Sequence, residues 1–149
     1  MQHKAIAILA SAFLLGGCAT AYQPMSFSGG YSEVRLNAET IQISVAGNGY
    51  TSTERARNIA LLRAADLTLE SGFKRFVVLG GQVGQEYAGS TPVVVNRIGN
   101  TMYASGGDEI QKPSGTLTVR LVGPNDPAFA NAFDADMIRT QLLPKLAPK

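Results

Sequence analysis

The chain has 149 residues, of which 45% are hydrophobic and 16% are charged, and its formal net charge at pH 7 is +2. This length suits one domain with a single core, and the composition is too apolar for a disordered chain. The small net charge, without any cluster of lysine and arginine, argues against a nucleic-acid-binding protein.

The first residues have the layout of an export signal. Lys4 precedes an apolar run over residues 5–15, and small residues follow up to Cys18. In a helix, the eleven residues of this run cover about 16 Å, whereas the hydrocarbon core of a bilayer is roughly 30 Å thick. We therefore expect residues 1–17 to be a signal peptide that is removed.

The residues before the only cysteine, Leu15-Gly16-Gly17-Cys18, resemble the lipobox of bacterial lipoproteins. The resemblance implies that Cys18 receives a diacylglyceryl group, that the Gly17–Cys18 bond is cut, and that the new amine is acylated. The lipid bilayer is then the first partner, and two or more acyl chains make such an anchor stable. Ala19, in place of an aspartate, implies the periplasmic face of the outer membrane rather than the inner membrane. The alternatives are an ordinary secretory peptide with a free thiol, or a buried core cysteine.

Loss of residues 1–17 also removes His3, the only histidine. With Cys18 acylated, the remaining chain lacks the residues of a Ser-His-Asp triad, a Cys-His dyad or a His- and Cys-based zinc site. We therefore expect a protein that is not an enzyme of these classes and that holds neither a metal nor a cofactor.

Two segments precede the first helix. Residues 18–30 lack periodicity and are rich in small residues, which predicts a tether between the acylated cysteine and the domain. Residues 39–46 alternate apolar and polar side chains, which predicts a strand with one buried face. Gly47-Asn48-Gly49 should end this strand.

Thr51 and Glu54 form a capping-box pattern, which predicts a helix from Thr51 to about Ser71.

Gly72 should end the helix in the left-handed conformation, with Phe73 packing back on its last turn. A strand is expected over residues 74–79, followed by a glycine-rich segment over residues 80–115. That segment contains a possible strand at residues 91–95 and a possible turn at Gly99-Asn100.

The alternation over residues 116–122 predicts another strand, and Asp126-Pro127 predicts the start of a final helical segment that runs to Leu143 before Pro144. The expected fold is α+β and two-layered. It comprises a small, mostly antiparallel sheet of three or four strands with a strand-helix-strand unit, one long helix and a C-terminal helix, all in one domain over residues 31–149.

Four segments of the chain resemble a family of small proteobacterial lipoproteins of unknown function. They are Gly30-Tyr31-Ser32-Glu33, Val45-Ala46-Gly47-Asn48, the run Leu61-Leu62-Arg63-Ala64-Ala65-Asp66-Leu67-Thr68, and Gly72-Phe73 with Phe76. The resemblance implies a location and a domain, and no catalytic residue beyond the acylated Cys18.

The residues leave three functions open. The first is a non-enzymatic lipoprotein that binds or supports another envelope component, with the glycine-rich segment and the turn Gly47-Asn48-Gly49-Tyr50-Thr51 as candidate contacts. The second is an envelope enzyme that uses carboxylates alone, with Asp66 and Glu70 four residues apart on one helix face. The third is a binder of a small polar or anionic ligand at the start of the helix.

Overall fold

A computed structural model describes residues 19–98 and 101–147. The signal peptide, Cys18 and the predicted turn at Gly99-Asn100 lie outside the described residues. In chain order the elements are β1 (Gly30–Arg35), β2 (Thr40–Ala46), α1 (Thr53–Glu70), β3 (Arg75–Ser90), β4 (Val94–Ile98), β5 (Thr101–Ser105), β6 (Glu109–Val122), a 3-10 turn (Phe129–Asn131), β7 (Phe133–Asp134) and α2 (Ala135–Leu146).

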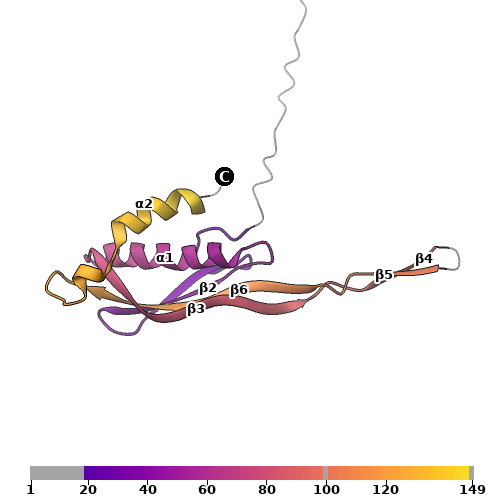
Figure 1. Cartoon of the computed structure of the whole chain (residues 1–149), viewed down its shortest axis with the longest axis horizontal. Coiled ribbons are helices and arrows are strands. Elements are labelled where there is room, and N and C mark those ends of the chain that lie inside the picture. Colours follow the sequence, from indigo (N-terminus) through magenta and orange to yellow (C-terminus); the bar gives the residue numbers. More distant parts are fainter. Residues whose placement is uncertain (1–18, 99–100, 148–149) are drawn as a thin grey trace, which may run out of the picture.

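Five strands form one antiparallel sheet in the order β1-β2-β6-β3-β7, and β4 and β5 pair separately. β2 and β3 both run antiparallel to β6, so they are parallel to each other, and α1 connects them. Both helices lie on the same side of the sheet, with α2 against α1 (Figure 1). The prediction of a small sheet of three or four strands was therefore wrong.

The sequence did not predict β1, because this strand has no alternation of hydrophobic and polar residues. Tyr31, Glu33 and Arg35 pair with Val45, Ile43 and Ile41 of β2 and so point to the helix side of the sheet. Two of these three side chains are charged and bond to α1 or to its C-cap instead of entering the core. A period-two search for apolar residues has no signal at such a strand.

The core lies between α1 and the central strands. The predicted strand over residues 39–46 is confirmed as β2. The small side chains of α1 at positions 60, 64 and 65 are fully buried, which allows the helix backbone to approach the sheet. The other buried apolar residues of this core include Ile41, Ile43, Val45, Ile59, Leu62, Phe76, Val119 and Leu121.

The two ends of α1 differ in how well the sequence predicted them. The N-cap is Ser52, whose Oγ accepts a hydrogen bond from the Arg55 amide at 3.0 Å, so the prediction of Thr51 as the cap was wrong. At the other end Gly72 has φ +80°, and the amides of Gly72 and Phe73 donate to the carbonyls of Leu69 and Thr68. This is a Schellman motif, as the glycine indicated.

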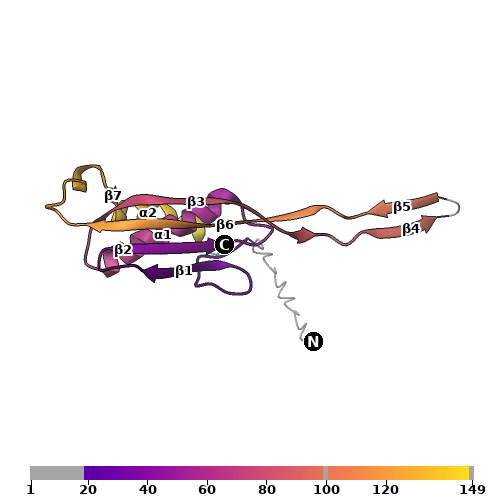
Figure 2. The ribbon, with the colours of Figure 1, turned by 90° about the horizontal axis from the view of Figure 1, so that it is seen from below.

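The glycine-rich segment forms an arm. β3 and β6 stay paired well beyond the helices, and the β4–β5 hairpin continues in the same direction (Figures 1 and 2). We call residues 86–112 the β arm. The predicted strand at residues 91–95 begins only at Val94, and the strands predicted at residues 74–79 and 116–122 are the body ends of much longer strands.

The C-terminal helix begins later than predicted. Asp126 does not open a helix: its carboxylate pairs with Arg120 and accepts from the Ala128 amide. The chain then makes the 3-10 turn and β7, and Asp134 caps α2 by accepting from the Met137 amide at 3.0 Å. α2 also runs past Pro144, because its last residue, Leu146, is buried in the core.

Candidate functional site

The segment expected to be a tether lies against the domain from Thr20 onward. Thr20 is only 1% exposed. Its amide donates to Thr51 Oγ1 at 2.8 Å, and its own hydroxyl donates to the Ser28 carbonyl at 3.0 Å. Two residues after the expected acylation site, the chain is therefore already part of the folded body.

The candidate contact turn, residues 47–51, is held by the same contacts. The amide of Asn48 donates to Thr20 Oγ1 at 3.0 Å, and the amide of Tyr50 donates to Asn48 Oδ1 at 3.0 Å. The Thr51 amide donates to the Asn48 carbonyl. These amides are bonded within the protein, so the turn presents them to its own side chains and carbonyls instead of to an anion.

Members of this turn have different roles. A Cβ on Gly47 would lie 2.6 Å from Pro113 Cγ and 2.8 Å from Thr51 Cβ, so close packing requires glycine there. Thr51 is buried, whereas Gly49 and Tyr50 are exposed. Of the five candidate contacts, Gly47 and Thr51 therefore support the turn, and Gly49 and Tyr50 are available to a partner.

An open cleft of about 620 Å³ lies between this turn and the base of the β arm. Among the described residues its lining is mostly neutral, with Glu109 as the one acidic side chain, and it includes Tyr50, Thr51, Gln85, Thr91 and Ile110. The structure thus brings the turn and the glycine-rich segment, the two predicted contact regions, to one place.

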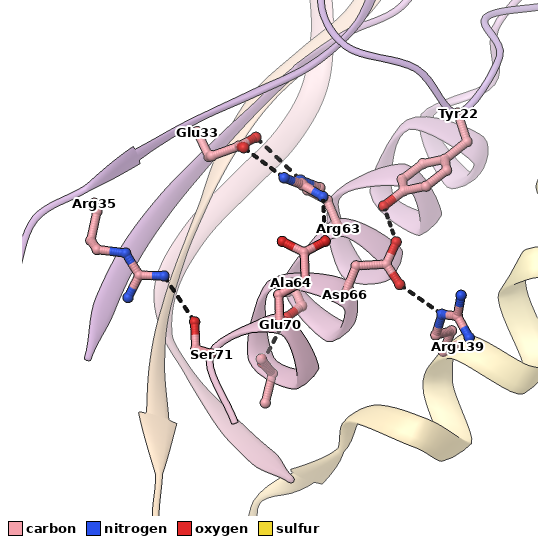
Figure 3. Close-up of polar contacts among 10 residues, drawn as sticks. Tyr22, Glu33, Arg35, Arg63, Ala64, Asp66, Glu70, Ser71 and Arg139 are labelled. Atoms are coloured by element: carbon pink, nitrogen blue, oxygen red, sulfur yellow. Dashed lines mark hydrogen bonds and ion pairs between the residues drawn. The ribbon is translucent and has the colours of Figure 1, made fainter. Parts of the chain in front are cut away.

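The carboxylates of Asp66 and Glu70 do not form a shared pair (Figure 3). Asp66 accepts from Tyr22 Oη at 2.5 Å and from Arg139 Nε at 2.9 Å. Glu70 pairs instead with Arg63 at 3.3 Å. Burial, together with the hydrogen bond to Asp66, raises the pKa of the Tyr22 phenol above its ordinary value. Asp66 therefore joins the N-terminal segment and α2 to α1.

Arg63 connects α1 to β1. Its Nη2 lies 2.7 Å from Glu33 Oε1, and its guanidinium lies over the Tyr31 ring at 4.9 Å from the centroid. Burial by itself would lower the pKa of Arg63, but the hydrogen bond and charge of Glu33 raise it overall. Arg63 and Asp66 of α1 are thus both bonded to other elements.

Within the described ranges 19–98 and 101–147, no group of three or more Asp, Glu, His or Cys residues is arranged to hold a metal ion. In the same ranges, no helix combines the length and apolar character needed to cross a bilayer. No family model, curated protein or solved structure matches the chain.

Sequence reasoning missed two parts of this region. The docked segment around Thr20 carries no periodic signal, and a two-stranded arm has no buried face to impose one. The only available signal for the arm was the density of glycine with short β-branched runs, such as Val93-Val94-Val95.

Proposed function

We propose that the chain is a membrane-anchored lipoprotein of the bacterial envelope, on the periplasmic face of the outer membrane, whose β arm binds or supports another envelope component without catalysis. The observation that carries this proposal is the arm itself. It projects from the body, and the helices leave it uncovered (Figures 1 and 2).

The surface of the β arm suits a protein partner. Tyr87, Val93, Val94 and Val95 are exposed on it, from 51% to 63%. Residues 86–112 contain only five charged side chains, which are Glu86, Arg97, Asp108, Glu109 and Lys112. Isolated two-stranded ribbons are marginally stable in water, and exposed strand edges and apolar patches favour pairing with another chain. A partner that covers the arm would remove both costs.

Site-specific photocrosslinking in living cells tests the role of the arm. A photoreactive residue replaces Val95 on the β arm. In the matched control it replaces Met137 on α2. The two native side chains are similarly exposed, Val95 at 57% and Met137 at 60%. We expect a discrete adduct with an envelope protein from position 95 and none from position 137. The same adducts from both positions, or no protein adduct from position 95, would contradict a contact role for the arm.

The anchor is tested on the same cells by mass spectrometry of the N-terminal peptide. We expect a chain that starts at an acylated Cys18 and remains with the outer membrane, and a Cys18→Ser variant that does not. A chain that keeps residues 1–17, or that carries an unmodified Cys18, would remove the membrane part of the proposal.

A further inference from the structure

The chain leaves little slack between the expected acylation site and the folded body. Thr20 follows Cys18 by two residues, so their Cα atoms are at most about 7 Å apart. Because Thr20 is buried and bonded to Thr51 and Ser28, it cannot move away from the body without breaking these contacts. The bilayer surface must then pass close to the residues around Thr20.

Arg55 holds the segment around Thr20 against the C-terminal end of α2. Its Nε donates to the Thr20 carbonyl at 2.8 Å, and its two terminal nitrogens donate to the carbonyls of Lys145 and Leu146, each at 3.3 Å. One guanidinium therefore joins the start of the described chain to the last turn of α2. An anchor attached here would keep this end of the body close to the membrane.

A hydrogen-bonded turn next to Thr20 presents an aromatic side chain. The backbones of Ser26 and Gly29 exchange two hydrogen bonds, and Gln23 Nε2 donates to the hydroxyls of Ser26 and Ser28. Phe27, at the tip of this turn, is fully exposed. Thr20 binds the Ser28 carbonyl, so Phe27 is one residue from a direct contact with the docked segment. Transfer of this exposed ring from water to an apolar environment would be favourable.

A second aromatic lies nearby. Tyr50 is 77% exposed, and its turn is bonded to Thr20 through Asn48. Neither residues 19–29 nor residues 47–51 contain an acidic side chain, and Lys145 at the end of α2 is exposed. Aromatic side chains favour the interface between lipid and water, and a lysine favours anionic headgroups.

We propose that Phe27 and Tyr50 form a membrane-contact surface that rests on the bilayer beside the acylated cysteine, with the ring of Phe27 inserted among the lipids. This inference rests on the proposed acylation of Cys18. It deepens the proposed function, because such a contact would fix the direction in which the β arm leaves the membrane.

Tryptophan fluorescence tests this surface, since the chain contains no tryptophan. Full-length lipoprotein carrying Phe27→Trp is reconstituted in vesicles of phosphatidylethanolamine and phosphatidylglycerol. The matched control is Leu36→Trp, at the opposite end of β1, where the native side chain is also exposed. We expect a blue-shifted emission that brominated lipids quench at position 27, and a water-like emission that soluble iodide quenches at position 36.

Equal, water-like emission at both positions would overturn the proposal. Circular dichroism checks the fold of each variant, and Tyr50→Trp replaces Phe27→Trp with the same expected contrast if the latter does not fold. Thiol labelling separates this failure from a failure of the anchor, because Cys18 is the only cysteine. A chain that takes up the thiol reagent is not acylated, so the comparison is made on preparations that take up no reagent.

Discussion

The hydroxyl of Tyr22 connects three parts of the molecule through one carboxylate. Tyr22 and Arg139 both donate to Asp66, so the N-terminal segment, α1 and α2 meet at this side chain (Figure 3). The Tyr22 ring also lies 4.8 Å from the Tyr31 ring, measured between centroids. A segment without regular structure is held in place here by a few specific polar and aromatic contacts.

Replacement of Tyr22 by phenylalanine should keep the ring contact and remove the hydrogen bond. Because hydrogen bonds to charged groups contribute about 1.5–3 kcal/mol, we expect Tyr22→Phe to lower the free energy of unfolding by about this amount at neutral pH. Urea unfolding followed by circular dichroism measures the change. A variant as stable as the wild type would contradict a structural role for this contact.

The same pair of proteins shows the effect of pH. The pKa of Tyr22 is raised in the folded state, so the folded protein holds this proton more tightly than the unfolded chain does. The stabilisation is complete below about pH 10, where free tyrosine titrates, and is lost as the pH rises above it. We therefore expect the difference in stability between wild type and Tyr22→Phe to stay constant up to about pH 9 and to shrink as the pH rises above about 10.

At the scale of elements, the sequence predicted what local physics determines. The alternation in β2 and the glycine at the end of α1 each create their own signal, and both features were confirmed. The N-cap of α1 is Ser52 instead of Thr51 because the Thr51 hydroxyl is bonded to Thr20, thirty-one residues earlier in the chain. No local pattern contains that partner.

The β arm was the largest element that the sequence did not predict. Neither face of the arm is covered by a helix, so its strands have no apolar alternation, and backbone pairing with correctly placed glycines holds them together. The sequence did predict that the chain turns between β2 and α1, at residues 47–51. Their division into supporting and exposed members depends on Pro113 and Thr20, which are distant in the sequence.

The junction between body and arm depends on Gly115. A Cβ at this position would lie 1.9 Å from the Gln82 carbonyl oxygen and 2.7 Å from Val83 Cα. These are backbone atoms of the paired strand, so no rotamer change relieves the clash. We expect Gly115→Ala to lower the free energy of unfolding by about 1–3 kcal/mol, as overpacking does.

The matched control is Gly84→Ala in β3, because no atom lies within 4 Å of the added Cβ. We expect this change to stay within about 0.5 kcal/mol of the wild type. Thermal unfolding of the two variants provides the comparison. Equal losses of stability would show that glycine is needed along the strands for a reason other than the contact at the junction.

At the scale of the whole molecule, the structure separates a packed body from the β arm. Among the side chains that the structure describes, none of the buried core residues lies between residues 91 and 108. Ser90 and Glu109 are the last paired residues of β3 and β6, so a short turn can join the strands at this point. The body should then fold without the outer part of the arm.

Replacement of residues 91–108 by Asn-Gly tests this separation, since this dipeptide favours a two-residue hairpin turn. A shorter loop costs slightly less entropy to close, so we expect the free energy of unfolding of the body to change by less than about 1 kcal/mol. Urea unfolding by circular dichroism measures it, and the helical signal of α1 and α2 should be retained. A large loss of stability would mean that the arm belongs to the folding unit. A body that keeps its stability without residues 91–108 would show that folding does not require the outer arm, as expected of a surface kept for contact with a partner.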